Sequence, residues 1–283
     1  MKKLTPFIDL VLYGNFWIAL AAAAMVLQTQ YLFSGEVQFN PFVGFVFFAT
    51  HCLYAIHRIV GLNKVEPFQG QGRYSVIARF KNHIIFYAVI SGIASFVMFW
   101  YLPVRWDWML FVPAIISLAY VLPMLGKQRR LRDFALIKIF LIALVWSWIT
   151  VVLTIREAHR PLDLSTFYLF AERACFIFAI TLPFDIRDLE VDRFTGVKTI
   201  PALLGIVKTR GLIAFSLGLM VFFSWQNFET GFYSIIDFLV LLLAALISFI
   251  IVYFAPRIKH DYYFTGLVDG LMILQFLLIW WLS

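Results

Sequence analysis

The sequence predicts an all-α polytopic membrane protein, a bundle of nine transmembrane helices. Its mean hydropathy is +0.88, and only 14% of its residues are charged, against about 25% in ordinary globular domains. The apolar residues form stretches long enough for a helix to cross a bilayer, and the basic residues are concentrated in every second connection between these stretches. A soluble surface cannot be built from this composition, so the chain is expected to lie within a lipid bilayer.

Nine apolar stretches approach or exceed the length of about 20 residues that a helix needs to cross a bilayer. They are residues 8–33, 42–63, 83–103, 106–126, 133–154, 165–184, 210–226, 234–254 and 263–282. Uninterrupted apolar runs indicate helices, because the strands of a membrane barrel alternate in polarity over about ten residues. No linker or low-complexity tract divides the chain, so residues 1–283 are expected to form a single domain.

The first stretch also has features of a secretory signal peptide, since Lys2 and Lys3 precede it. Its apolar run is too long for the core of a typical signal peptide, and Asp9 interrupts its beginning. We therefore expect a retained first transmembrane helix.

The basic residues fall on one side of the predicted spans in 19 of 23 cases. Those 19 are Lys2, Lys3, Arg58, Lys64, Arg73, Arg79, Lys81, Lys127, Arg129, Arg130, Arg132, Lys138, Arg187, Arg193, Lys198, Lys208, Arg210, Arg257 and Lys259. By the positive-inside rule, the N-terminus and the connections after even-numbered spans are predicted to be cytoplasmic, in an inner or plasma membrane. Nucleic acid is not an expected partner, because no soluble basic domain exists to bind it.

Other polar residues inside the predicted spans give little functional information. Cys52 and Cys175 provide neither a disulfide framework nor the spacing of zinc ligands. Asn15, Glu172 and Arg173 lie in apolar surroundings, and the sequence assigns them no role.

The connection after the sixth span begins with a cluster of acids, in FDIRDLEVDR (184–193). Asp185, Asp188 and Asp192 have the spacing i, i+3, i+7, which places them on one helix face, while Glu190 points elsewhere. Three such carboxylates at the end of a membrane span repel one another unless a cation lies among them. Hard oxygen ligands suit Mg²⁺, which completes its coordination with water and phosphate oxygens. The cluster therefore predicts a magnesium site and a phosphate-bearing substrate.

Cations follow these acids, as the binding of a diphosphate requires. Arg193 and Lys198 lie in RFTGVKTIPALLG (193–205), where Gly196 permits a tight turn. The alternative is that the acids form only surface salt bridges with Arg187, Arg193 and Lys198.

A matching polar cluster lies at the end of the second span. His51, Tyr54 and Arg58 have the same spacing as the acids, and a glycine and Lys64 follow them, as a glycine and a lysine follow the acids. The two clusters indicate a site between two halves of the bundle, which a diverged internal repeat would produce.

An alternative for the histidines is a haem or transition-metal site. His51 and His57 lie about 120° apart around a helix and do not converge on one ion. His83, from the third span, could approach one of them.

These clusters resemble the motifs of the UbiA-type intramembrane prenyltransferase superfamily, and the likeness extends over essentially the whole chain. DIRDLEVDRFTGVKTIPALLG (185–205) is similar to the family's second Asp-rich motif with its Gly–Lys–Thr–Pro tail. YVLPMLGKQRRLRDF (120–134) is similar to the segment after the fourth span, where a tyrosine precedes a basic loop. The resemblance implies a nine-helix bundle around a central cavity that opens to lipid and is capped on its cytoplasmic side.

The resemblance also implies a reaction. Mg²⁺ bridges the Asp-rich motifs and the diphosphate of a prenyl donor, the prenyl chain leaves as an allylic cation, and a lipophilic acceptor captures it. Asp185, Asp188 and Asp192 are thereby implied as metal ligands and catalytic residues. The residues implied to contact the diphosphate are Arg193, Lys198, Lys127 and Arg130.

The first motif departs from the family, whose pattern there is N-x-x-x-D-x-x-x-D. Thr50, Tyr54 and Arg58 stand at those positions, with His51 beside them, so no carboxylate remains to hold a second Mg²⁺. Arg58 is expected to pair with phosphate oxygens directly, because a guanidinium suits that bidentate geometry. His51 and Tyr54 are expected to donate hydrogen bonds, and Lys64 is assigned to the same diphosphate site.

The sequence thus favours an enzyme that moves a prenyl group from a polyprenyl diphosphate to an aromatic, quinone-precursor or lipid acceptor, with Mg²⁺-assisted release of diphosphate. Tyr54 and Tyr120 are the candidates to line the allylic cation. One alternative is a different diphosphate donor, such as a phosphoribosyl one. Another is a non-catalytic protein of the same fold that binds an isoprenoid, a quinone or a partner. A transporter is disfavoured, because transporter ion sites lie near the bilayer midplane, whereas these acids are predicted to lie near a membrane face.

Overall fold

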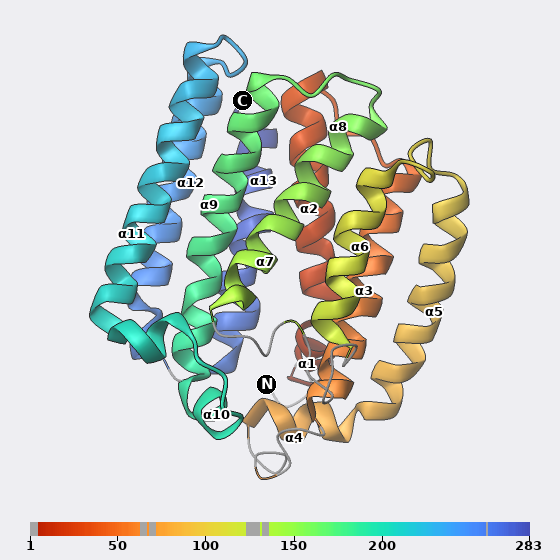
Figure 1. Cartoon of the computed structure of the whole chain (residues 1–283), viewed down its shortest axis with the longest axis vertical. Helices are drawn as coiled ribbons and strands as arrows, with labels where there is room; N and C mark the ends of the chain where they lie inside the picture. The colour runs from red at the N-terminus through yellow and green to blue at the C-terminus, as the bar shows by residue number, and fades with distance from the viewer. Residues whose placement is uncertain (1–4, 63–66, 68–71, 123–130, 132–135, 259) are drawn as a thin grey trace.

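Eight helices in the described part of the chain are long and apolar enough to cross a membrane. The computed structural model describes residues 5–62, 67, 72–122, 131, 136–258 and 260–283. The eight spans are α2 (Phe16–Ser34), α3 (Pro41–Leu62), α5 (Lys81–Trp100), Ile137–Glu157, α9 (Leu164–Arg187), α11 (Ile200–Glu229), Ile235–Arg257 and Tyr263–Leu282. The all-helical polytopic fold is therefore confirmed (Figure 1).

The count of nine spans is not confirmed. Where the sequence predicts a span over 106–126, the structure has α6 (Trp108–Val121), an apolar helix of 14 residues that is shorter than the others. Residues 123–130 lie outside the described part of the chain.

Four of the spans contain several helical segments. Ile137–Glu157 comprises α7 (Ile137–Ser147), the π-helix η3 (Trp148–Leu153) and α8 (Thr154–Glu157). Ile235–Arg257 comprises α12 (Ile235–Phe254) and η4 (Ala255–Arg257), and Tyr263–Leu282 comprises the π-helix η5 (Tyr263–Val268) and α13 (Asp269–Leu282). In α11, Gly205 takes a non-helical conformation with φ of 77°, which kinks the helix. This helix corresponds to the seventh predicted span, and it begins at Ile200 instead of at residue 210.

The first predicted span, 8–33, is not one continuous helix. It is broken between α1 (Thr5–Tyr13) and α2 because the buried Asn15 has a left-handed φ of 71°. Gly14 precedes the break, and a Cβ added there would lie only 2.1 Å from the backbone oxygen of Leu10. A glycine is therefore required at that position.

Two short helices lie in the connections that follow α3 and α9. They are α4 (Gly72–Arg79), between α3 and α5, and α10 (Leu189–Phe194), between α9 and α11. In Figure 1 both lie at the lower end of the bundle, near the N-terminus, whereas the C-terminus lies at the upper end.

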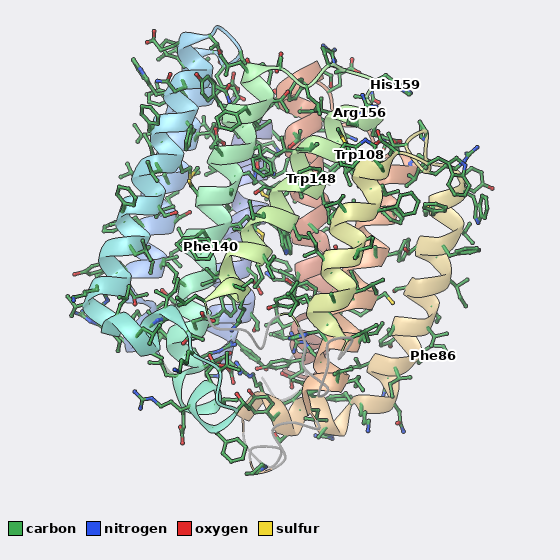
Figure 2. The ribbon with its side chains drawn as sticks, in the orientation of Figure 1. Phe86, Trp108, Phe140, Trp148, Arg156 and His159 are labelled. Atoms are coloured by element: carbon green, nitrogen blue, oxygen red, sulfur yellow. The ribbon has the colours of Figure 1, made fainter. Side chains whose placement is uncertain are left out.

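The core of the bundle forms where α9 packs against α7 and α11, and where α2 packs against α13 and α3. Met25 and Phe176 are among the fully buried side chains of this core. Large apolar side chains such as Phe86 and Phe140, labelled in Figure 2, remain exposed. This arrangement fits a protein whose outer surface faces lipid.

Glu172 and Arg173 turn out to connect helices inside the bundle. The guanidinium of Arg173 donates to the backbone oxygen of Met25 at 3.1 Å and to the hydroxyls of Thr150 at 3.2 Å and Thr29 at 3.4 Å. The carboxylate of Glu172 accepts from the hydroxyls of two further residues, Ser224 at 2.9 Å and Tyr233 at 3.0 Å. Adjacent residues of α9 thus bind α2 and η3 on one side and α11 on the other.

We expect Arg173→Met to lower the free energy of unfolding by about 1–3 kcal/mol, because it removes charged hydrogen bonds from a buried network. The matched control is Arg156→Met. Arg156 pairs with Asp107 at 3.0 Å but is 42% exposed, so its loss should cost about 1 kcal/mol or less. Equal shifts of the thermal unfolding midpoint in detergent would contradict this expectation.

Candidate functional site

One end of the bundle contains a cavity of about 350 Å³. Its walls come from α2, α3, α4, α6, α7, α9, α10 and the last span. Apolar and aromatic side chains such as Ile18, Trp146 and Met272 line it together with charged residues. A cavity that combines an apolar wall with a few charged groups suits a ligand with an apolar body and a charged head.

The three predicted acids all line this cavity. Asp185 lies in the last turn of α9, Asp188 follows the end of that helix, and Asp192 lies in α10. They are not on one continuous helix, because Asp188 has φ of −92° and ψ of 7°, outside the helical geometry. Glu190 is exposed and is not among the lining residues, in keeping with its predicted orientation.

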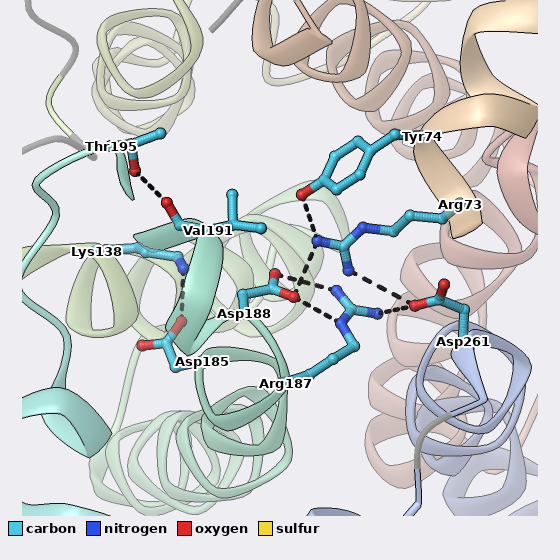
Figure 3. Close-up of polar contacts among 9 residues, drawn as sticks. All are labelled: Arg73, Tyr74, Lys138, Asp185, Arg187, Asp188, Val191, Thr195 and Asp261. Carbon is cyan, nitrogen blue, oxygen red and sulfur yellow. Dashed lines mark hydrogen bonds and ion pairs between the residues drawn. The ribbon is translucent and has the colours of Figure 1, made fainter. Parts of the chain in front are cut away.

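Two of these acids form close ion pairs, which Figure 3 shows. The ammonium of Lys138 lies 2.5 Å from Asp185, and both side chains are largely buried. Asp188 lies between two guanidiniums, with Arg187 Nε at 2.7 Å and an Arg73 nitrogen at 2.9 Å. These pairs reduce the repulsion that three carboxylates would otherwise experience at this end of the bundle.

The guanidiniums also determine the ionisation of Asp188. Burial alone would raise the pKa of this carboxyl, but Arg187 and Arg73 outweigh it and hold the pKa well below its usual range. Asp188 is therefore a carboxylate at neutral pH, as a ligand for a divalent cation must be.

A fourth acid, Asp261, lies across from the same two arginines. Its carboxylate is 3.8 Å from Arg73 and 3.6 Å from Arg187 (Figure 3). Figure 3 also shows that the Arg73 side chain donates to the hydroxyl of Tyr74, at 2.7 Å.

The α3 side of the cavity carries Tyr54 and Arg58, two of the candidate site residues. Arg58 donates to the backbone oxygen of Leu12 at 3.3 Å, and its guanidinium lies 5.6 Å from the centre of the Tyr13 ring. The Tyr54 ring packs edge-on against that of Trp146, with centres 6.4 Å apart. These contacts fix both side chains within the wall of the cavity.

His57 of α3 and Tyr120 of α6 also line the cavity. The rings of His57 and Tyr120 lie 6.0 Å apart, and both face the cavity. Tyr120, a candidate to line the allylic cation, thus lies in the wall of the cavity.

His51 does not line the cavity, contrary to its predicted contact with diphosphate. It is fully buried between α3 and α5, where its Nδ1 lies 3.0 Å from the Ser91 hydroxyl. Its ring packs 4.5 Å from that of Phe16. The i, i+3, i+7 spacing is not sufficient to bring His51 to the cavity, because α5 covers that part of α3.

The predicted cations are distributed unevenly around the site. Arg193 and Lys198 are exposed and are not among the lining residues. Lys64, Lys127 and Arg130 lie outside the described part of the chain.

The sequence reasoning missed five charged residues at this site. They are Arg73, Lys138, Arg187, Asp261 and Asp269. The sequence indicates the first two only as part of the charge asymmetry and Arg187 only as a surface partner of the acids. Asp269 is an acid inside the last predicted span, and that exceptional position is the signal that marks it.

The donor atoms at this site suit Mg²⁺ better than a transition metal. Asp185, Asp188 and Asp192 offer hard oxygens to a cavity with space for water or phosphate oxygens. Among the residues the structure describes, no three His, Cys, Asp or Glu side chains converge tightly enough to hold an ion by themselves. Mg²⁺ usually takes only one or two carboxylates and several other oxygens, so this arrangement is compatible with that ion.

The sequence matches the model of a known family, and the fold matches several solved structures. The model of the UbiA prenyltransferase family matches residues 81–268. A UbiA homolog from Archaeoglobus fulgidus bound to DMAPP and Mg²⁺ has a TM-score of 0.67 and 12% identity, over 96% of this chain and 98% of that chain. The same homolog bound to GPP and Mg²⁺ has a TM-score of 0.66 and 12% identity, over 96% and 99% of the two chains.

A structure of a digeranylgeranylglyceryl phosphate synthase has a TM-score of 0.59 and 14% identity, over 99% of this chain and 96% of that chain. No match was found among curated proteins. At these identities the solved structures show a shared fold.

We expect Lys138→Met to destabilise the protein by about 3–5 kcal/mol, because it leaves the buried Asp185 carboxylate without its cation. The double variant Lys138→Met/Asp185→Asn should recover most of that loss, since it removes both charges together. Thermal unfolding in detergent measures both. A double variant no more stable than the single one would contradict the expectation.

Proposed function

The chain belongs to the UbiA prenyltransferase family, and we propose that it moves a prenyl group from a polyprenyl diphosphate to a lipophilic acceptor. The observation that supports this most directly is the cavity itself. Four carboxylates, three guanidiniums and the Lys138 ammonium line that cavity, together with apolar side chains, within a membrane-spanning bundle. A prenyl diphosphate has the same division into an apolar chain and a charged head.

In this proposal, Asp185, Asp188 and Asp192 hold Mg²⁺ at the charged end of the cavity. The ion, when bound, neutralises charge on the departing diphosphate. The carboxylates orient the ion, and Lys138 remains beside Asp185 as a second positive group. Support comes from the homolog from Archaeoglobus fulgidus, whose structures contain Mg²⁺ with GPP or DMAPP.

The guanidiniums of Arg58, Arg73 and Arg187 supply the remaining positive charge. A planar guanidinium can donate two parallel hydrogen bonds to phosphate oxygens, and does so most strongly where water is excluded. Arg58 takes the place of the carboxylates that the family carries on this helix. Arg193, Lys198, Lys64, Lys127 and Arg130 remain proposed as further contacts for the diphosphate.

The apolar wall holds the prenyl chain and excludes water from the allylic cation. Tyr54 and Tyr120 present aromatic rings that can stabilise a cation at this wall. The acceptor is an aromatic compound, a quinone precursor or a lipid that enters from the bilayer. The clustering of basic residues at this end of the bundle supports a cytoplasmic location for the site.

One observation favours a second candidate function. Among its residues, α3 carries no carboxylate. A protein of this fold that only binds an isoprenoid or quinone needs no second metal, so this departure is compatible with binding without turnover. An assay of diphosphate release separates the two functions.

We expect purified protein in lipid nanodiscs to release diphosphate from at least one of three labelled donors: dimethylallyl, geranyl and geranylgeranyl diphosphate. Release should require Mg²⁺ and should fall about 100-fold or more in Asp188→Asn, because that change removes a ligand of the ion that stabilises the leaving diphosphate. Glu190→Gln is the matched control and should retain activity, since Glu190 is exposed and lies outside the cavity wall.

The assay includes a phenolic acid, a quinone precursor and a polar lipid extract as acceptors. Binding without release under every condition would refute catalysis and favour the non-catalytic function. Release only from a phosphoribosyl diphosphate would identify the other class of donor.

We expect Arg58→Ala to weaken the binding of inorganic diphosphate about tenfold or more, because a charged hydrogen bond is lost. Arg58→Lys should give an intermediate loss, since an ammonium keeps the charge but not the bidentate geometry. Arg79→Ala is the control, because Arg79 is exposed on α4 and is not a lining residue. Calorimetry measures the affinities, and an unchanged affinity in Arg58→Ala would exclude this role for Arg58.

A further inference from the structure

Arg73 and Arg187 share two carboxylates that come from different parts of the chain. The Asp188 carboxylate is the nearer, at 2.9 Å from Arg73 and 2.7 Å from Arg187. The Asp261 carboxylate is the farther, at 3.8 Å from Arg73 and 3.6 Å from Arg187 (Figure 3). The four side chains form a closed quartet with two positive and two negative charges.

Asp261 differs from Asp188 in its position relative to the cavity. Arg73, Arg187 and Asp188 are lining residues, whereas Asp261 is not. It lies in the short connection between η4 and η5 and abuts the start of α4, where a Cβ added to Gly72 would be 3.6 Å from its Oδ2. Asp261 therefore contacts the arginines without forming part of the ligand space.

The two guanidiniums depend to different degrees on the carboxylates for their positions. The Arg187 guanidinium also lies 5.1 Å from the ring centres of Phe184 and of Phe264, which restrict it on both sides. Arg73 has its neighbour Tyr74 and otherwise the two acids. Among the contacts of the described residues, Asp261 is thus more important for the position of Arg73.

A cation bound to Asp188 would compete with the guanidiniums for the same oxygens. Two guanidiniums that lost this carboxylate would repel each other across a poorly solvated cavity wall. Asp261 is the negative charge that would remain beside them, on the side away from the ligand.

We propose that Asp261 is a positioning residue, which holds Arg73 and Arg187 at the cavity wall so that both can donate to the diphosphate while Asp188 binds the metal. This inference rests on the proposed function, because it presupposes a diphosphate ligand. It assigns a role to an acid that lies outside both predicted motifs, at the beginning of the last span.

The test measures the affinity of the full-length protein in nanodiscs for inorganic diphosphate with Mg²⁺, by calorimetry. Asp261→Asn should weaken binding about tenfold, the effect expected when one charged contact no longer fixes its partner. Asp261→Glu should restore most of the affinity, because it returns the charge. In an Arg73→Gln background, Asp261→Asn should have a much smaller further effect, since its main target is already gone.

Three results would overturn the inference while leaving the proposed function in place. They are an unchanged affinity in Asp261→Asn, no recovery in Asp261→Glu, and an undiminished further loss of affinity in the Arg73→Gln background. The last is what a merely structural role would give, together with a lower unfolding midpoint. A wild-type protein that does not bind diphosphate would overturn both the inference and the proposed function.

Discussion

The pairing of charges in a poorly solvated space is the constraint on which the cavity end of this bundle depends. Charged groups in such surroundings are stable only when they are paired or hydrogen-bonded. Asp188 meets this requirement through Arg73 and Arg187, and Asp185 meets it through Lys138. The segment α4 contributes Arg73 to these pairs, and the connection before η5 contributes Asp261, which lies near both arginines. The same set of ion pairs therefore joins the segments at this end of the bundle and provides the charged groups of the cavity.

The buried charges in the middle of the bundle satisfy the same constraint with a different outcome. Glu172 and Arg173 are paired with hydroxyls and a backbone oxygen from neighbouring helices, and neither lines the cavity. Their contacts hold α9 against α2 and α11. The acids at the end of α9 instead face a space of about 350 Å³, so a ligand can exchange with their present partners. Access to a cavity, and not burial or charge alone, distinguishes the candidate site from a structural network.

Much of this arrangement can be predicted from sequence, and the missing part has a physical reason. Apolar length predicts most of the spans, and the spacing of Asp185, Asp188 and Asp192 predicts that they belong together, because both patterns are local. The breaks at Asn15 and Gly205 depend on single backbone angles that apolar composition does not record. Arg73 meets Asp188 across 115 positions, so no short pattern could join them. Helical spacing likewise could not reveal that α5 would cover His51.

The replacement of acids by Arg58 on α3 changes what that wall of the cavity requires. A carboxylate can contact a diphosphate only through a metal ion, since both are negative, whereas a guanidinium can bind it directly. Arg58 is fixed by Leu12 and Tyr13, and Asp269 lies within electrostatic range of it from α13. In the proposed function, the α3 wall then carries its positive charge as part of the chain, while the α9–α10 wall combines the Arg187 guanidinium with the charge that Mg²⁺ brings to its acids. Such a site keeps a metal-independent share of its affinity for diphosphate, and its dependence on Mg²⁺ resides in the acids of the second motif.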